Sequence, residues 1–435
     1  MKLPEKLAID RDVKRVFQAW TRWIEDPETR DDPFVSLRYV AGQTTYDALR
    51  AGPFSLAELP HIDALRQWVG SLTQARIVSG LDLDLAKATR DETDPDGTEA
   101  PWPSWLDSWR GVAHASSAAE VREHIEHALP RGTIIASILR ERSLLRREVA
   151  RRLGLEPVFT RESTERLAEQ FLERTGDVAR EVLRGPVLLQ AAARDAPDGW
   201  PARLTARWPL ELFEAGLEGL RVPLSDPFAT FRRPSSTSGA ASFARALGAF
   251  GFALRTVTGA PSLPFALTRS PGFVEAHRWG TLFASLAMSV EFHRRALRVG
   301  KSTASSQARA VARSALFELR LSSVRLLLME APERFEELSQ LLFGIPLDKR
   351  LAGAWPAARD DETERFVGMA TSCRLESELV ERFDTDWFCN PRGWLFLRSL
   401  GSGAVHDDPE ALPEEQQEQE PLVTAWTRRF EQAFA

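Results

Sequence analysis

The sequence predicts a mainly α-helical globular protein, and three observations carry this prediction. Apolar residues recur at three- and four-residue spacing over residues 11–24, 118–129 and 162–183, which is the period of an amphipathic helix. Alternating strand patterns are scarce, and the best of them, near residues 220–235, is interrupted by prolines. The composition, with 43% hydrophobic and 27% charged residues, is typical of a soluble globular protein. We therefore expect helices throughout and at most one small β-sheet.

Two of the expected helices have recognisable ends. Ser117 and Glu120 have the spacing of a capping box, in which two side chains satisfy free backbone N–H groups at a helix start. Pro332 is favoured at the first position of a helix, and Gly344 is favoured just beyond the last one. Ser117 and Glu120 therefore predict a helix that starts at residue 118. Pro332 and Gly344 predict a helix that lies between them.

Two further helices are expected in the C-terminal part. Residues 304–330 follow one apolar period without a break, which predicts a single long helix. The residues expected on its buried face are Val311, Ala315, Leu319 and Leu326. Residues 422–434 predict a short amphipathic helix. Residues 91–111, which contain three Trp, and residues 195–209 are rich in turn-forming types and predict loops.

The length bounds the domain organisation. A chain of 435 residues forms one large domain or two to three ordinary ones. We expect an N-terminal helical half over 1–194 and a C-terminal half over 195–405, which the loop at 195–209 separates. Residues 406–421 are acidic and rich in Gln, and predict a solvated connector to the terminal helix, so that 406–435 form a third part.

Charge and cysteine usage exclude several kinds of partner. The net charge is −6, from 56 basic and 62 acidic residues without a separate basic block, which predicts no nucleic-acid partner. No uncharged apolar run has transmembrane length, so we expect no membrane partner. The N-terminus lacks the apolar core of a signal peptide, and Cys373 and Cys389 are too few for a disulfide framework. These features favour a cytoplasmic protein, and the abundance of Arg and Ala favours a GC-rich bacterial genome.

The residues that could hold a catalytic metal are sparse. A zinc peptidase helix contains His-Glu-x-x-His, in which two His one turn apart bind the metal and Glu acts as the general base. No His of this chain is directly followed by Glu, so the motif is excluded everywhere. Two Glu-x-His pairs remain, Glu275 with His277 and Glu291 with His293. Residues two apart on a helix point in different directions, so structural hydrogen bonding is the favoured interpretation of both pairs.

Three blocks of the C-terminal half carry a family resemblance. Residues 233–265 contain a polar turn, then Leu-Gly-Ala-Phe-Gly-Phe-Ala, then a segment that ends in Leu-Pro-Phe. Residues 270–286 end in a helix that runs through Leu282-Phe283. Residues 380–393 read Val-Glu-Arg-Phe-Asp-Thr-Asp-Trp-Phe-Cys-Asn-Pro-Arg-Gly, which is the most specific match. In these blocks the chain resembles the M3 family of bacterial zinc metallopeptidases, the group of oligoendopeptidase F and thimet oligopeptidase.

The resemblance implies a helical ellipsoid with a central cleft, but a degenerate metal site. The family helix Leu-His-Glu-x-Gly-His-Ala places its two His ligands on Gly248 and Phe252, and its general base on Ala249. None of these side chains binds zinc or transfers a proton. The family's third ligand, a Glu, falls on His277 without a gap, or on Glu275 with a two-residue shift.

The oxyanion-stabilising part of the family site is also altered. Relatives carry a Tyr-bearing helix where this chain has residues 359–374, and those phenols help to hold the tetrahedral intermediate. The chain has only Tyr39 and Tyr46, both far from that segment. Without the metal and the base there is no activated water. The resemblance therefore implies a C-terminal half without peptidase chemistry. It also implies that the N-terminal half covers the cleft as a lid.

The function that follows is that of a non-catalytic homologue, a pseudoenzyme, of an M3-type zinc oligopeptidase. It is expected to need no metal and no other cofactor. Its expected partner is a peptide or a protein, with an active peptidase relative as one candidate. Two alternatives stay open. One is a scaffold protein that uses its outer surface, which includes Trp102, Trp105 and Trp109. The other is a hydrolase with a relocated metal site, formed by Glu275, His277, Glu291 and His293.

Overall fold

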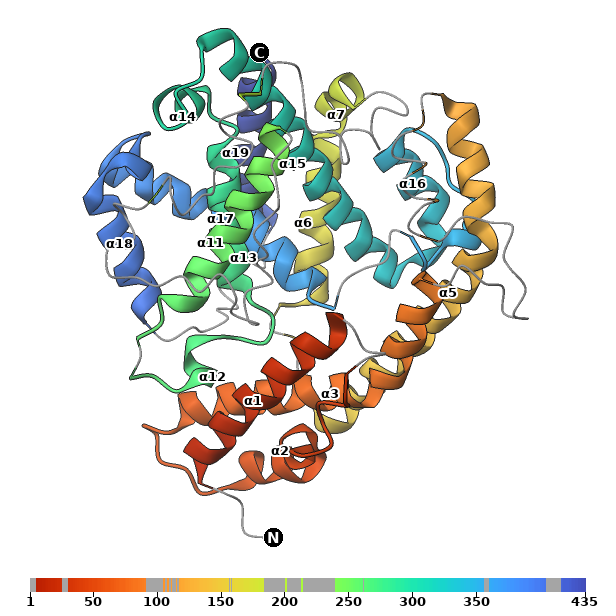
Figure 1. Cartoon of the computed structure of the whole chain (residues 1–435), viewed down its shortest axis with the longest axis vertical. Helices are drawn as coiled ribbons and strands as arrows, with labels where there is room; N and C mark the ends of the chain where they lie inside the picture. Colours follow the sequence, from red (N-terminus) through yellow and green to blue (C-terminus); the bar gives the residue numbers. More distant parts are fainter. Residues whose placement is uncertain are drawn as a thin grey trace.

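The structure is a computed structural model of the chain (Figure 1). It describes residues 5–25, 30–90, 117–155, 159–183, 239–260, 262–355, 360–403 and 416–435, with the single positions 105, 108, 111, 115, 157, 200, 201 and 213. Every regular element in this part of the chain is a helix, which confirms the predicted mainly α fold. The candidate sheet near residues 220–235 lies outside the described residues.

The N-terminal helices form one end of the molecule (Figure 1). They are α1 (Lys6–Glu25), the 3-10 helix η1 (Arg38–Ala41), α2 (Gln43–Ala51) and α3 (Leu59–Arg90). Their apolar faces form a core of their own, in which Phe17 and Trp68 pack edge to face with 4.8 Å between ring centroids. The short helix α12 (Phe265–Thr268) joins this core from a distant part of the sequence.

One carboxylate attaches the N-terminal helices to α12. Asp10 on α1 accepts hydrogen bonds of 2.8 Å from the backbone N–H groups of both Phe265 and Ala266. The first N–H groups of a helix have no partner within it, so the Asp10 carboxylate satisfies α12 from outside. His61 on α3 lies 3.3 Å from the same carboxylate. Asp10 thus connects α1 to two residues that lie 255 and 256 positions later in the sequence.

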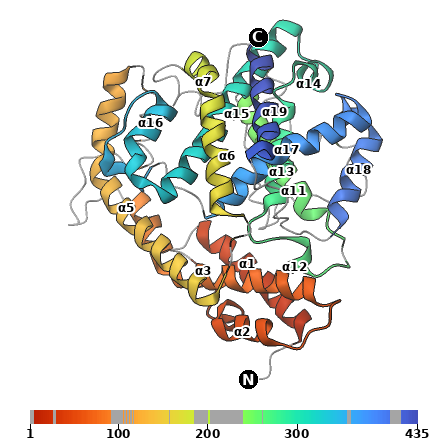
Figure 2. The same cartoon turned by 180° about the vertical axis from the view of Figure 1, so that it is seen from behind.

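The remaining helices form the larger body of the molecule (Figure 2). They are α5 (Ala118–Leu153), α6 (Arg161–Arg174), α7 (Gly176–Val182), α11 (Ala240–Val257), α13 (Val274–Leu286), α14 (Val290–Arg295), α15 (Lys301–Glu330), η3 (Pro332–Arg334), α16 (Phe335–Phe343), η4 (Lys349–Leu351), α17 (Glu362–Phe383), η5 (Trp387–Cys389), α18 (Pro391–Ser402) and α19 (Gln416–Phe434). In the described part of the chain, no helix is both long and apolar enough to cross a bilayer. Helix α6 packs on α15 and α19, so the main core includes both sides of the predicted boundary at residue 194. That boundary stays a prediction.

Most helix ends agree with the sequence. The Ser117 hydroxyl accepts a hydrogen bond from the Glu120 N–H, 3.2 Å away, and Gly344 ends α16 with φ of 72°. The predicted stop of the helix at residue 129 is wrong, because α5 continues through Pro130 and packs along α3. The predicted single helix over 162–183 is also wrong, because the chain divides at Thr175 into α6 and α7.

Helices α11 and α13 approach closely through glycines. A Cβ atom on Gly251 would lie 2.5 Å from the carbonyl oxygen of Trp279, and one on Gly280 would lie 2.9 Å from the carbonyl oxygen of Gly248. A side chain at either position would force the backbones apart, which typically costs about 1–3 kcal/mol. The pair runs antiparallel, since Gly248 lies near Ala284 and Phe252 lies near Gly280.

Candidate functional site

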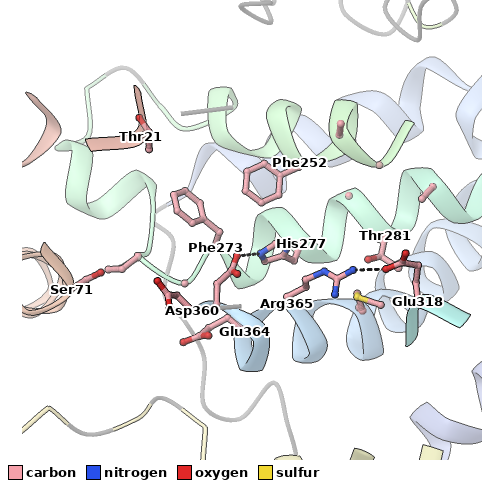
Figure 3. Close-up of a pocket in the computed structure, with 18 of the residues that line it drawn as sticks. Thr21, Ser71, Phe252, Phe273, His277, Thr281, Glu318, Asp360, Glu364 and Arg365 are labelled. Carbon is pink, nitrogen blue, oxygen red and sulfur yellow. Dashed lines mark hydrogen bonds and ion pairs between the residues drawn. The ribbon is translucent and has the colours of Figure 1, made fainter. Parts of the chain in front are cut away.

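A cavity of about 1040 Å³ lies between the N-terminal helices and the body (Figure 3). Helices α1 and α3 line one side, and α11, α13, α15 and the start of α17 line the other. Ligand pockets commonly have volumes of about 300–1,000 Å³, so this cavity has the size of a binding site. Among the described residues, the central cleft that the family resemblance implies is therefore open space that their side chains do not fill.

The positions of α11 on which the resemblance places the family's ligands and base face this cavity. Gly248, Ala249 and Phe252 all line it, because residues three and four apart share one face of a helix. Phe250 points the other way and is fully buried, with its ring 5.2 Å from that of Phe283. The three cavity-lining side chains offer no atom that binds zinc. This helix therefore does not fit the metal that the resemblance implies, and we derive no metal-dependent step.

His277 lies directly beside Phe252, one of these positions. Its ring is 5.1 Å from that of Phe252, edge to face, and it lines the cavity (Figure 3). Its Nε2 atom is 3.0 Å from the Oδ2 atom of Asp361, at the start of α17. Glu275, the other candidate for the third-ligand position, forms an ion pair of 2.7 Å with Arg278 and is not among the lining residues.

An aromatic group forms the wall of the cavity next to His277. Phe273 has a left-handed backbone, with φ of 56°, and directly precedes α13. Such a conformation costs a non-glycine residue about 1–3 kcal/mol, so the surroundings must hold it. The Phe273 ring lies 5.6 Å from Phe252 and 5.8 Å from Phe17. Trp68 holds the preceding loop, since its Nε1 donates to the carbonyl of Arg269 over 2.7 Å.

An ion-pair network lies at the edge of the cavity, which two of its members, Arg146 and Asp360, line. Arg142 on α5 donates to Asp82 on α3 and to Asp360, both over 2.6 Å, and Arg146 donates to Asp360 over 2.6 Å. Burial raises the pKa of Asp82. Burial also acts to raise the pKa of Asp360, but the hydrogen bond from Arg142 and the charge of Arg146 outweigh it and lower that pKa.

This network corrects one expectation about the surface. Residues 140–152 are rich in arginine, a pattern that on a helix is typical of a solvated face. The side chains of Arg142 and Arg146 are only 13% and 20% exposed, because both turn toward Asp360. A further arginine makes a similar pairing on α17, where Arg365 donates to Glu318 over 2.9 Å and to Glu362 over 3.1 Å. Charged groups inside a protein need such partners.

The structure does not bring the relocated-site residues together. Glu291 is bound by Arg295 through an ion pair, and Glu275 by Arg278. His293 is completely buried, and its Nε2 donates to the carbonyl of Ala287 over 2.8 Å. Among the described residues, no group of three or more His, Cys, Asp and Glu could hold a metal ion.

We expect His293 to make stability depend on pH. Burial lowers its pKa below the ordinary value of 6.5, so the unfolded chain binds the proton more tightly. The free energy of unfolding should therefore decrease as the pH falls through 6.5. His293→Gln should cost about 1 kcal/mol at about pH 8 through the altered hydrogen bond, and less at about pH 5. Urea unfolding of both proteins at the two pH values measures this difference. A constant difference would contradict the assignment.

Burial raises the thiol pKa of both cysteines, and the described tryptophan of the 91–111 segment is buried. Cys373 is buried, and burial raises the pKa of its thiol to about 11, so it is a weak nucleophile at neutral pH. Burial also raises the pKa of the Cys389 thiol. Trp105 is only 6% exposed. Trp102 and Trp109 lie outside the described residues.

Several cavity residues could not be found from the sequence. Asp361 lies 84 positions from His277, and no motif connects them. Glu364 and Asp360 follow a segment without a recognisable pattern. A partial signal existed for Phe273, since it follows Pro-Gly, which marks a turn before a helix. The cavity therefore contains an acidic group that sequence reasoning missed.

Comparison with known proteins supports the fold. No protein-family model and no curated protein matches the chain. Among solved structures, the chain is similar to the crystal structure of a putative oligoendopeptidase F from Bacillus anthracis str. Ames, with a TM-score of 0.51 and 11% sequence identity. The match covers 96% of this chain and 86% of that one. At this identity the likeness shows the fold alone, which is a helical scaffold like that of an M3 peptidase.

Proposed function

We propose that this protein is a non-catalytic homologue of an M3-type zinc oligopeptidase, and that it binds peptides in its central cavity. One observation carries the proposal. The three positions to which the resemblance assigns two zinc ligands and the general base, Gly248, Ala249 and Phe252, all line the cavity. A metal ligand needs a donor atom, and a general base needs a titratable group, but these side chains have neither.

The character of the cavity favours a peptide as its ligand. Aromatic side chains such as Phe17, Phe252 and Phe273 line part of it, and charged groups such as Asp361 and Arg365 line another. Peptides combine apolar side chains with charged and hydrogen-bonding groups, so they complement both surfaces. The scaffold alternative has less support, since Trp105 is buried.

A capture experiment tests this proposal. The untagged protein is dialysed against a synthetic pool of short peptides with free ends, and bound peptides are identified by mass spectrometry with and without added zinc. We expect a reproducible subset to be retained with unchanged mass. Ala249→Trp should reduce retention by about tenfold because it fills the cavity, whereas Ala119→Trp on the exposed start of α5 should not.

Three results would overturn the proposal in different ways. Cleaved peptides, in amounts that Ala249→Trp reduces, would show an enzyme. No retained peptide, from a protein whose circular dichroism shows the expected helices, would exclude peptide binding. Zinc that stays bound in stoichiometric amount after dialysis against a mild chelator would contradict the loss of metal chemistry and indicate a site elsewhere in the chain.

A further inference from the structure

Helix α3 presents a row of uncharged polar side chains to the cavity. Gln67, Ser71 and Gln74 all line it, and their spacing of four and three residues places them on one face of the helix. Figure 3 shows Ser71 on the side that the N-terminal helices form, apart from His277 on α13. The α3 row, as we call these three residues, therefore belongs to the wall that faces the helices of the body.

The α3 row has hydrogen-bonding groups that the protein does not use. Among the described residues, none of its three side chains makes a hydrogen bond or an ion pair. The charged lining residues differ, because Arg146 pairs with Asp360 and Arg365 pairs with Glu318. In a largely apolar pocket, a small number of polar groups orient the ligand. The α3 row is therefore a part of the wall that can bind a polar group of a ligand.

Helix α1 adds an apolar row to the same wall. Phe17, Trp20 and Ile24 line the cavity, and their spacing of three and four residues places them on one face of α1. Ile24 is 43% exposed, although its side chain is large and apolar. A ligand that covers this α1 row would remove apolar surface from water, which favours binding.

The two rows run side by side. Phe17 on α1 contacts Trp68 on α3, and the residues seven positions earlier on the two helices, Asp10 and His61, also meet. The helices therefore run parallel and in register. The wall consists of a polar row and an apolar row that follow the same direction.

We infer that the α3 row binds the main chain of an extended peptide, whose apolar side chains contact the α1 row. This inference rests on the proposed function. A peptide group has one donor and one acceptor, and the side-chain amide of Gln offers both. Gln67 and Gln74 are about 10.5 Å apart along the helix axis, and three residues of an extended chain span about 10–11 Å. The α3 row therefore matches about three residues of backbone and does not require a particular sequence.

Ester forms of one peptide test the inference. The probe is the capped pentapeptide acetyl-Ala-Leu-Ala-Phe-Ala-amide, which has no charged end. It is compared by titration calorimetry with three forms in which the N–H of the second, third or fourth residue is replaced by an ester oxygen. At least one ester should bind about five- to tenfold more weakly, because it lacks a donor and leaves an acceptor of the α3 row without a partner.

Matched variants assign the lost hydrogen bond to α3. Gln67→Met and Gln74→Met keep the length of the side chain but remove its amide, and Ser71→Ala removes the hydroxyl. In the variant that lacks the acceptor, the penalty for the ester should largely disappear. Gln432→Met, at an exposed position of α19 that does not line the cavity, should behave as the wild type. Circular dichroism confirms that each variant is folded.

The outcomes separate this inference from the proposed function. If every ester binds as tightly as the amide, recognition of the main chain is excluded and peptide binding stands. Penalties that persist unchanged in all three α3 variants would place the recognition of the main chain elsewhere and overturn the inference. If the peptide pool is captured but the pentapeptide does not bind, recognition depends on more than the main chain, and the inference is wrong. If neither the pool nor the pentapeptide binds to the folded protein, the proposed function fails.

Discussion

A variant that carries Gly248→His, Ala249→Glu, Phe252→His and His277→Glu is expected to bind about one zinc ion per chain. Two imidazoles at the spacing of Gly248 and Phe252 would lie one turn apart on the face of α11 that lines the cavity. The carboxylate introduced by His277→Glu would come from the position whose ring now contacts Phe252 at 5.1 Å. The expected result is a change from negligible to stoichiometric zinc, measured by plasma mass spectrometry after dialysis.

The matched control carries the same three substitutions on α11, but has His277→Gln in place of His277→Glu. Removal of the third ligand should weaken zinc binding by about 10–100-fold, which a competition titration with a chelator measures. If the complete variant folds but binds no more zinc than the control, then the assignment of the ligand positions to α11 and α13 is wrong. Peptidase activity is not expected to return, because the chain's two tyrosines, Tyr39 and Tyr46, both lie in the N-terminal helices.

Replacement of Arg320 is expected to cause the largest loss of stability. Its side chain is 2% exposed, and burial lowers its pKa to about 10, so it remains charged at neutral pH. It donates to the carbonyl of Leu172 over 2.9 Å, to the hydroxyl of Thr175 over 2.8 Å and to the carbonyl of Leu341 over 2.9 Å. One guanidinium group therefore satisfies the C-terminal ends of both α6 and α16, where the helix dipole favours positive charge.

Arg320→Leu should lower the free energy of unfolding by about 3 kcal/mol, because it leaves buried carbonyl groups without donors. Arg320→Lys should lower the free energy of unfolding by a smaller amount, since lysine keeps the charge but offers fewer directed donors. Arg309→Leu, on an exposed face of the same helix, should change the stability by less than about 0.5 kcal/mol. Chemical unfolding followed by circular dichroism compares the three. Equal losses for Arg320→Leu and Arg309→Leu would contradict the role of Arg320.

Local patterns predicted the helices well, because a helix is specified by residues that are close in sequence. Ser117 caps α5 as its spacing indicated, and the uninterrupted apolar period of 304–330 became α15. The failure at Pro130 has a physical reason, since packing along α3 stabilises a helix that the local sequence would end. Local propensity cannot include that tertiary contribution.

The site was predictable only in part, for the same reason. The family resemblance placed Gly248, Ala249 and Phe252 on one face, and helical geometry is enough to bring them together. The partner of His277 is Asp361, and a partner of Arg142 is Asp360, and these pairs depend on how distant helices pack. No spacing rule connects such residues, so these pairs became visible only in three dimensions.

The glycine contact between α11 and α13 has a consequence for which substitutions the two helices tolerate. Gly251 meets the backbone of α13 on the packed side of α11, whereas Ala249 lines the cavity. The residue that sets the spacing of the helices and the residue that lines the cavity thus lie on different sides of α11. A substitution at Ala249 should therefore change the lining of the cavity, whereas one at Gly251 should change the distance between the two helices. In such an arrangement the lining of the cavity can vary at Ala249 while the spacing of the helices stays the same.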